Sequence, residues 1–153
     1  MERKLTELVL RTLELRDIED VLAIQAKSPE IAQWSLWDYD RVARGEMAGW
    51  VTESEGGDIT AFIVARRIAN DLEILNFAVR PTARRQGIGA ALLGEALRWS
   101  SAFSAGQAFL EVRASNLTAL RFYEQHKFQV TGRRPRYYTA PIEDALVLSA
   151  QIT

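Results

Sequence analysis

The chain has 153 residues, of which 48% are hydrophobic and 25% are charged, and its net charge is −1. These values are typical of one globular domain, so we expect a single domain over residues 1–153. The sequence has no cysteine and a single histidine, His126. This composition excludes disulfides, thiolate metal sites, a covalent cysteine thioester and histidine metal clusters, and we expect no metal. No apolar run reaches the roughly 18–20 residues of a membrane span.

Charge is distributed unevenly along the chain. Residues 1–60 carry a net charge of −6, residues 61–108 of +3 and residues 109–153 of +2. A basic second half favours an anionic ligand there, although chance variation of surface charge explains the pattern equally well. The overall charge of −1 argues against a general nucleic-acid binder. Charges scattered through residues 1–15 leave no signal-peptide core, so we expect a cytoplasmic location.

Strands and helices alternate in the predicted order of elements. Alternating apolar residues predict a strand over 8–15, and Asp17 is expected to cap a helix that ends near residue 26. The order of all elements implies an α/β (α+β) fold, with a mixed, mostly antiparallel sheet and helices on both faces. Further helices are predicted at 38–47, 87–101 and 116–126, and further strands at 49–52, 59–68, 72–79, 107–113, 128–131 and 146–149.

A loop with two glycines joins the strand at 72–79 to the next helix. Gly87 and Gly89 open this helix, whose first N–H groups lack internal partners and carry partial positive charge. Arg84 and Arg85 add formal charge, so the loop has the chemistry of a phosphate site. It lacks the lysine of a P-loop and the third small residue of a dinucleotide fingerprint. The alternative interpretation is that the glycines only help the helix to begin and that the arginines are solvated without binding a ligand.

A second group of polar residues lies on the strand at 107–113 and the helix after it. Glu111 points away from the face of its apolar neighbours. Asn116 is placed to cap the helix, and Tyr123 returns to within about 20° of the same helix face. A carboxylate and a phenol are therefore expected to converge on one cleft. Each residue taken alone also has a purely structural explanation: Glu111 can be a solvated strand residue, Asn116 a helix cap and Tyr123 a residue packed between helix and sheet.

The chain resembles the GNAT superfamily of acetyl-CoA-dependent N-acetyltransferases in three segments: LEILNFAVRPTARRQGIGAALL, LEVRASNLTALRFYEQHKF and GRRPRYYTAPIEDALVL. The resemblance covers most of the chain and is strongest from about Leu72 to Leu148. Within the superfamily it is closest to the bacterial enzymes that acetylate the N-terminal alanine of ribosomal protein S18. It implies a GNAT-like fold, acetyl-CoA as cosubstrate and a protein N-terminus, that of S18, as the partner.

The resemblance also implies a role for each matching residue. Glu111 corresponds to the general base, and Tyr123 to the general acid that protonates the departing CoA thiolate. Glu73 is the second candidate for the base, because other members place a carboxylate on this strand. Backbone N–H groups near Ala78 are expected to stabilise the oxyanion. The positions implied to bind acetyl-CoA are Phe77, Ala78 and Val79 on the strand, Arg84, Arg85, Gln86, Gly87, Ile88, Gly89 and Ala90 around the pyrophosphate, and Asn116.

Two departures from the family pattern concern a helix end and the acceptor side. Lys127 stands where members have glycine, so we expect it to take a left-handed cap at a cost of about 1 kcal/mol or less. His126 is expected to be a solvated residue at that helix end. The aromatic loop at Trp34 lacks the proline that members often have before this tryptophan. Tyr137 and Tyr138 resemble paired tyrosines beside the acceptor groove, with strand packing as the alternative.

Three functions are compatible with these residues. The first is N-terminal acetylation, because an α-amine with a pKa of about 7.7–8.0 needs only modest help from a carboxylate to lose its proton. Without cysteine, the transfer is expected to be direct in a ternary complex. The nearest alternative is the same transfer to a small-molecule amine or to a lysine side chain, whose pKa is about 10.4. A non-catalytic module that binds acyl-CoA is the third.

Overall fold

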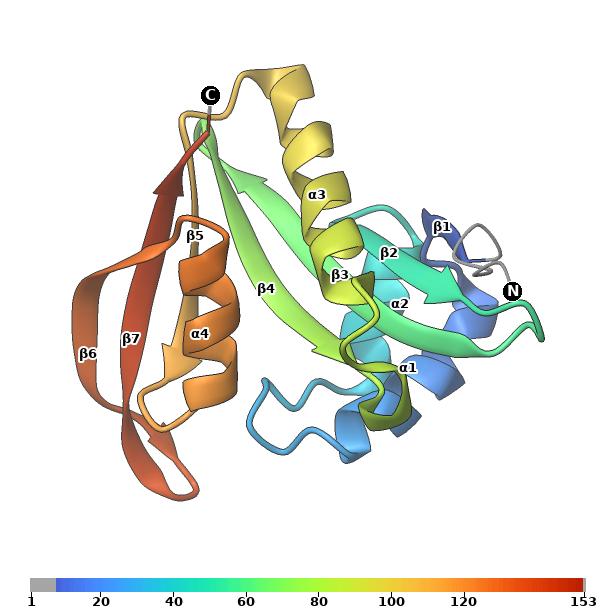
Figure 1. The fold of residues 1–153 in the computed structure, drawn as a ribbon, viewed down its shortest axis with the longest axis horizontal. Coiled ribbons are helices and arrows are strands. Elements are labelled where there is room, and N and C mark those ends of the chain that lie inside the picture. Colours follow the sequence, from blue (N-terminus) through green and yellow to red (C-terminus); the bar gives the residue numbers. More distant parts are fainter. Residues whose placement is uncertain (1–7, 153) are drawn as a thin grey trace.

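The computed structural model describes residues 8–152. Residues 1–7, part of the segment 1–15 that was assessed as a signal peptide, lie outside the described residues. The elements follow one another in the predicted order (Figure 1). No helix within the described range is both long and apolar enough to cross a membrane. The strands and α-helices are β1 (Val9–Thr12), α1 (Ile18–Ala26), α2 (Leu36–Ala43), β2 (Ala48–Glu53), β3 (Ile59–Ile68), β4 (Asp71–Val79), α3 (Ile88–Ser100), β5 (Gln107–Arg113), α4 (Leu117–Gln125), β6 (Gln129–Thr139) and β7 (Ile142–Gln151).

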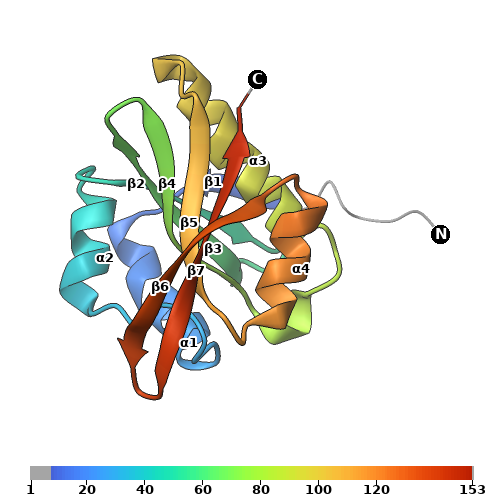
Figure 2. The same ribbon diagram turned by 90° about the vertical axis from the view of Figure 1, so that its left-hand side faces the viewer.

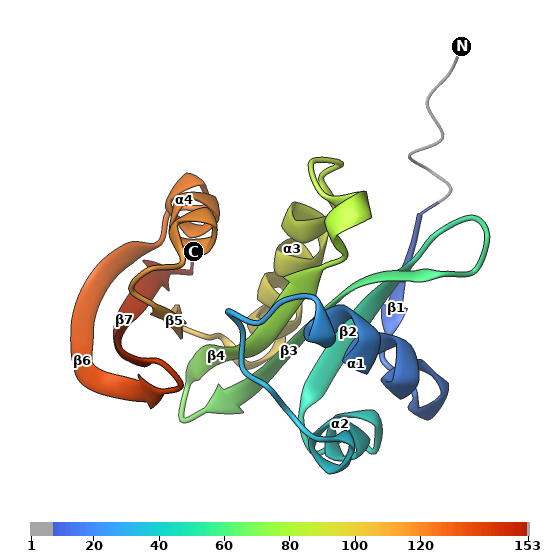
Figure 3. The same ribbon diagram turned by 90° about the horizontal axis from the view of Figure 1, so that it is seen from below.

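The seven strands form one sheet in the order β1-β2-β3-β4-β5-β7-β6. Only β4 and β5 pair in parallel, and every other neighbouring pair is antiparallel. Figure 3 shows α3 and α4 on one face of this sheet and α1 and α2 on the other. The predicted mixed, mostly antiparallel sheet with helices on both faces is confirmed.

Two apolar layers hold the helices against the sheet. Strand β3 contributes to both layers, because Ile63 packs beneath α3 whereas Phe62 and Val64 pack against α1 and α2. Burying one such side chain contributes about 1.5–3 kcal/mol, so these contacts fix the helices over the strands. The α3–α4 layer also contains Leu72, Leu92, Leu110, Phe128 and Leu148, and the α1–α2 layer contains Leu13, Val21, Ile24, Tyr39 and Val51.

Strand β4 carries a β-bulge that changes which residues face each layer. The β3 partners of Ile74 and Asn76 are consecutive residues, so Leu75 is the extra residue of the bulge. Ile74 packs beneath α3 before the bulge, and Phe77 packs there after it. Ala78 packs in the α1–α2 layer. The bulge therefore resets the alternation of β4 just before the residues predicted to bind a cofactor.

The starts of the first two helices agree only in part with the prediction, because α1 follows Asp17 as predicted but lacks its cap. Asp17 precedes α1, but its carboxylate makes no capping bond to this helix. It accepts hydrogen bonds from two Arg11 guanidinium nitrogens and from the Glu14 N–H, each at 2.8 Å. Helix α2 begins at Leu36 because the Ser35 side chain accepts a hydrogen bond from the backbone N–H three residues later.

The last two strands are longer than predicted. Strands β6 and β7 form the hairpin shown in Figure 2. They include residues 132–139, among them Pro135, and residues 142–145, and the predicted strands at 128–131 and 146–149 leave all of these out. Proline removes a hydrogen-bond donor, which an edge strand tolerates, and β6 is the edge of the sheet. The pairing is also irregular between Arg134 and Tyr138, which weakens the alternation that identifies a strand.

Candidate active site

Strands β4 and β5 separate after a short paired stretch. Leu72 and Glu73 of β4 are the residues that pair with β5. The following parts of the two strands, 74–79 and 110–113, do not pair with each other, and Figure 3 shows the strands diverging. Each strand therefore presents an inner backbone edge to the gap between them.

The register of β4 on β3 shows which N–H groups face this gap. The Arg80 N–H donates to a carbonyl oxygen of β3 at 2.7 Å, which marks a hydrogen-bonded pair. Such pairs alternate along an antiparallel ladder, so Ala78 bonds to β3 while Phe77 and Val79 turn their N–H and C=O groups toward β5. Consistently, Arg84 Nε donates to the Val79 carbonyl oxygen at 3.1 Å. The backbone N–H groups that face the gap are therefore those of Phe77 and Val79, the two neighbours of Ala78.

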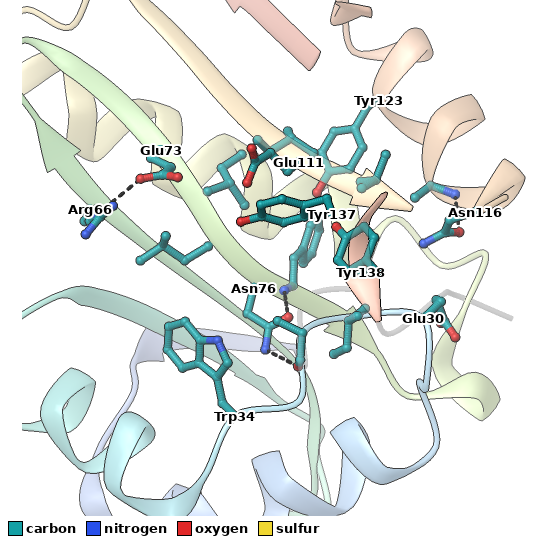
Figure 4. A pocket seen from close by; sticks show the side chains of 18 residues that line it. Glu30, Trp34, Arg66, Glu73, Asn76, Glu111, Asn116, Tyr123, Tyr137 and Tyr138 are labelled. Atoms are coloured by element: carbon teal, nitrogen blue, oxygen red, sulfur yellow. Dashed lines mark hydrogen bonds and ion pairs between the residues drawn. The ribbon is translucent and has the colours of Figure 1, made fainter. Parts of the chain in front are cut away.

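A cavity of about 340 Å³ lies at this gap. Figure 4 shows side chains that enter it from β4, β5, α4, the β6–β7 hairpin and the segment between α1 and α2. The structure therefore brings together residues from distant parts of the sequence. The predicted site residues that line the cavity are Glu73, Phe77, Glu111, Asn116, Tyr123, Tyr137 and Tyr138, and Trp34 lines it as well.

Two carboxylates enter the cavity from neighbouring strands. Glu111 points away from the α3–α4 layer, as predicted, and forms an ion pair with Arg134 of β6. The Glu73 carboxylate accepts a hydrogen bond from Arg66 Nε at 2.8 Å. The side chains of Glu111 and Glu73 are only 19% and 15% exposed. Both are therefore largely shielded from bulk water, and an arginine balances the charge of each.

Tyr123 reaches the cavity from the other face of the sheet. It belongs to the α3–α4 layer, where its ring centroid lies 6.3 Å from that of Phe77 and 5.3 Å from that of Phe128. Burial raises the pKa of the Tyr123 phenol above its usual value of about 10. The phenol is therefore protonated at neutral pH and can donate a proton into the cavity.

The glycine loop presents its backbone at the end of β4, outside this cavity. Gly87 has a left-handed φ of +80° at the start of α3, and Arg85 has a φ of +65°. The first hydrogen bond of the helix runs from the Ala91 N–H to the Gly87 carbonyl at 3.1 Å. The N–H groups of residues 88–90 have no backbone acceptor within the described range, so they are available to an anion.

Close packing explains the second glycine of the loop. A Cβ on Gly89 would lie 3.3 Å from the Phe122 ring and 3.6 Å from the Phe77 ring. Gly89 therefore lets the start of α3 approach a residue that lines the cavity. Ile88 is buried, which leaves its backbone for ligand contacts. The other predicted cofactor residues outside the cavity are Ala78, Val79, Arg84, Arg85, Gln86, Gly87 and Ala90.

The two ends of α4 agree only in part with the predictions. The Asn116 side chain caps the helix, accepting from the Ala119 N–H at 3.1 Å, and Lys127 takes the predicted left-handed conformation with φ of +72°. His126 is not simply solvated: its Nδ1 lies 2.8 Å from the Phe122 carbonyl oxygen and its ring stacks on the Phe122 ring. This contact helps to fix the helix end that carries the phenol.

The paired tyrosines line the cavity from the hairpin. The ring centroids of Tyr137 and Tyr138 lie 5.1 Å apart, and the Arg113 guanidinium lies 4.3 Å from the Tyr138 ring centroid. Burial and the nearby negative charge of Glu111 raise the pKa of Tyr138 to about 12. Both rings therefore offer neutral hydroxyls and aromatic surface to whatever enters the cavity.

Sequence analysis missed several polar residues of this region, among them Glu30, which lines the cavity from the segment between α1 and α2. Arg66 and Arg134 pair with the two carboxylates, and Asn76 is buried at the cavity wall. The position of Asn76 within an apolar strand was the one available signal, because a buried amide requires hydrogen-bond partners. Within residues 8–152, no group of three or more histidine, aspartate and glutamate side chains is arranged to hold a metal ion.

Comparisons with known proteins agree with this geometry. The model of the acetyltransferase (GNAT) family matches residues 12–128. A Bacillus subtilis protein provisionally named a ribosomal protein bS18-alanine N-acetyltransferase is 29% identical over 144 residues, which cover 94% of this chain and 95% of that protein. The Escherichia coli K12 protein named ribosomal protein bS18-alanine N-acetyltransferase is 32% identical over 102 residues, 65% of this chain and 69% of that protein. The crystal structure of the Escherichia coli ribosomal-protein-S18-alanine N-acetyltransferase superposes with a TM-score of 0.79 at 26% identity, covering 95% of this chain and 94% of that one.

Proposed function

Because the chain belongs to the acetyltransferase (GNAT) family, whose acetyl donor is acetyl-CoA, we propose that it acetylates the N-terminal α-amine of a protein, and that this protein is ribosomal protein S18. The observation that carries the proposal is the cavity at the β4–β5 gap, where Glu111 and Tyr123 converge from opposite faces of the sheet. The relatives named for the same acceptor support the choice of amine.

The residues around the gap fit acetyl-CoA in two places. The unpaired edge of β4 offers the N–H groups of Phe77 and Val79 to the acetyl and pantetheine parts. The start of α3 offers the N–H groups of residues 88–90 to the pyrophosphate, with Arg84 and Arg85 beside them. The close approach at Gly89, where a Cβ would crowd the Phe122 ring and touch the Phe77 ring, keeps these two parts of the site together. Asn116 lines the cavity from the next helix.

Glu111 is the proposed base for the acceptor amine. It lies on the face of the sheet opposite the α3–α4 layer, and it is shielded from bulk water. An α-amine with a pKa of about 7.7–8.0 is partly deprotonated at neutral pH, so one carboxylate can take its remaining proton directly or through water. Glu73 enters the same cavity from the neighbouring strand and is the competing candidate.

Tyr123 is the proposed acid for the departing thiolate. Its hydroxyl enters from the α3–α4 side, so the base and the acid stand on opposite sides of the gap. The amine can then approach the thioester carbonyl from one face while sulfur leaves toward the other. The chain has no cysteine, which supports direct transfer from acetyl-CoA to the amine without a cysteine thioester.

The acceptor side of the cavity fits an extended N-terminus. The segment that carries Trp34 forms one wall, and Tyr137 and Tyr138 form the other. Aromatic rings and neutral hydroxyls can pack against a short peptide and bond its backbone. An enzyme that modifies a ribosomal protein meets it in the cytoplasm, which is therefore the proposed location.

Three matched peptides test the choice of acceptor. One carries a free N-terminal alanine followed by basic residues, the second has this amine blocked but keeps an internal lysine, and the third has neither amine. CoA release is measured from acetyl-CoA, and mass spectrometry locates the acetyl group. We expect turnover on the first peptide alone. Turnover on the blocked peptide would assign the enzyme to lysine side chains, and turnover only on small amines would also contradict the proposal.

Matched substitutions test the assignment of the base. Glu111→Gln is expected to lower kcat about 10²–10⁴-fold, because it removes the proton acceptor while keeping the shape of the side chain. Glu73→Gln should have a much smaller effect, and the exposed Glu124→Gln on α4 serves as the control. A larger loss in Glu73→Gln than in Glu111→Gln would move the base to β4.

A further inference from the structure

Asn76 connects the cofactor edge of β4 to the acceptor wall through a buried chain of hydrogen bonds. It follows the β4 bulge, is 5% exposed and lines the cavity. Its Nδ2 donates to the Ala32 carbonyl oxygen at 3.0 Å and to the Tyr39 hydroxyl at 2.9 Å. Its Oδ1 accepts from the Phe77 N–H at 3.2 Å. One side chain thus contacts both sides of the site.

The chain continues from Tyr39 to the backbone of Trp34. The Tyr39 hydroxyl donates to Gln25 Oε1 at 2.5 Å, and the same oxygen accepts from the Trp34 N–H at 3.0 Å. Gln25 Nε2 returns a hydrogen bond to the Trp34 carbonyl oxygen at 2.8 Å. Both Ala32 and Trp34 line the acceptor side of the cavity, so this wall is held by the network.

The donors and acceptors at the two ends fix the orientation of every group in the chain. Backbone N–H groups can only donate, so the Gln25 oxygen must face the Trp34 N–H and the Asn76 oxygen must face the Phe77 N–H. The carbonyl of Ala32 can only accept, which places the Asn76 nitrogen beside it. The Asn76 amide therefore cannot flip without breaking three hydrogen bonds.

Two acceptors compete for the Phe77 N–H. It faces the β4–β5 gap, where it is available to the carbonyl oxygen of an acetyl group, and it already donates to Asn76. One N–H satisfies one strong acceptor well. An acetyl group that takes this N–H displaces the Asn76 oxygen, and rotation of the amide then strains its bonds to Ala32 and Tyr39.

We propose that Asn76 is a positioning residue that loosens the acceptor wall, residues 31–34, when the acetyl group of acetyl-CoA occupies the gap. CoA lacks the acetyl carbonyl oxygen, so its binding leaves the network intact. The acceptor wall therefore responds differently to acetyl-CoA and to CoA. It moves to admit an acceptor only when an acetyl group is bound and can be transferred. The inference rests on the acetyl-CoA site of the proposed function and not on the identity of the acceptor.

Hydrogen exchange of the Trp34 backbone amide, followed by NMR, tests this coupling. The protein is saturated with acetyl-CoA or with CoA, without any acceptor. In the wild type we expect the amide to exchange about fivefold or more faster with acetyl-CoA than with CoA, the lower end of typical coupling between sites. Asn76→Ala should bring the ratio to within about twofold while acetyl-CoA still binds. Because no acceptor is present, a wrong choice of S18 would leave this result unchanged.

Two further variants keep the experiment decisive. Asn70→Ala, in the exposed turn before β4, is the matched control and should retain the wild-type ratio. Tyr39→Phe removes the hydroxyl between Asn76 and Gln25, and it should also reduce the ratio even if Asn76→Ala fails to fold. Equal exchange of the wild-type amide with the two ligands would overturn the proposal, as would a wild-type ratio that persists in Asn76→Ala or in Tyr39→Phe.

Discussion

Tyr123→Phe separates the proposed proton-donor role of this residue from its packing role. The substitution removes the hydroxyl and keeps the ring, so the contacts with Phe77 and Phe128 remain. The hydroxyl makes no hydrogen bond to a side chain or backbone group of the described residues. Its loss leaves no buried partner unsatisfied, and the free energy of unfolding should change by less than about 1 kcal/mol.

The expected kinetic effect is much larger than the effect on stability. Loss of a general acid lowers the rate of the chemical step by about 10²–10⁴-fold. The KM for acetyl-CoA should change little, because the proposed role of the hydroxyl is to protonate the leaving thiolate and not to hold the bound thioester. Burial raises the pKa of the Tyr123 phenol. The wild type should therefore keep its protonated acid, and any activity that depends on it, up to and beyond the usual phenol pKa of about 10.

CoA release measured with a thiol reagent is a clean assay here, because the chain contributes no thiol of its own. Tyr138→Phe is the useful comparison: it removes a hydroxyl on the acceptor side and should raise the KM for the peptide more than it lowers kcat. A kcat of Tyr123→Phe within about threefold of the wild type would refute the assignment of the acid. A large loss of stability would instead show that the hydroxyl has a structural partner.

Three further substitutions test other parts of the structure. Gly89→Ala places a Cβ 3.3 Å from the Phe122 ring. It should raise the KM for acetyl-CoA about tenfold, which corresponds to about 1.4 kcal/mol and lies within the range of about 1–3 kcal/mol for a packing conflict, with the KM for the peptide as the control. Gly49→Ala would bring a Cβ to 2.5 Å from Val42 Cγ1, and urea titration should show a loss of about 1–3 kcal/mol with unchanged kcat. Burial raises the pKa of Asp17, but hydrogen bonds from an arginine and a backbone N–H outweigh it and lower the pKa below its usual value of 3.8. The stability that this carboxylate contributes is therefore present above pH 3.8 and is lost as the pH falls through its lower pKa in the folded state. Urea titrations over this pH range should show that the free energy of unfolding depends less steeply on pH in Asp17→Asn than in the wild type.

Local patterns predicted those elements whose residues carry a clear alternation or period. The strand at 107–113 matches β5, whose residues alternate between the core and the cavity. The strand at 59–68 matches β3, whose nearly continuous apolar run is buried on both faces of the sheet. The β6–β7 hairpin was underestimated because Gly132 and Pro135 suggest a loop, and only the position of β6 at the sheet edge makes them tolerable in a strand.

Contacts of the candidate site could be predicted only where both partners lie on neighbouring elements. Glu111, Asn116 and Tyr123 belong to one strand–helix unit, so their spacing was enough to predict that they meet at one cleft, and all three line the cavity. The pairing of Glu111 with Arg134 spans two strands of the sheet, and it depends on the register of a hairpin whose pairing is irregular. Register follows from an alternating hydrophobic pattern and from turn geometry, and the mostly exposed strand β6 carries no such alternation.

The separation of β4 from β5 is what turns two ordinary faces of a sheet into one site. In a continuous sheet, Glu111 and Tyr123 would remain on opposite sides of a hydrogen-bonded layer and would never share a substrate. The strands part after Glu73, and the bulge at Leu75 then turns Phe77 toward the α3–α4 layer. The gap thereby gains the proposed base, Glu111, on the acceptor side, the proposed acid, Tyr123, on the thiolate side, and between them the Phe77 N–H, which donates to Asn76. Restoring strand pairing across the gap should abolish activity even with every one of these side chains in place.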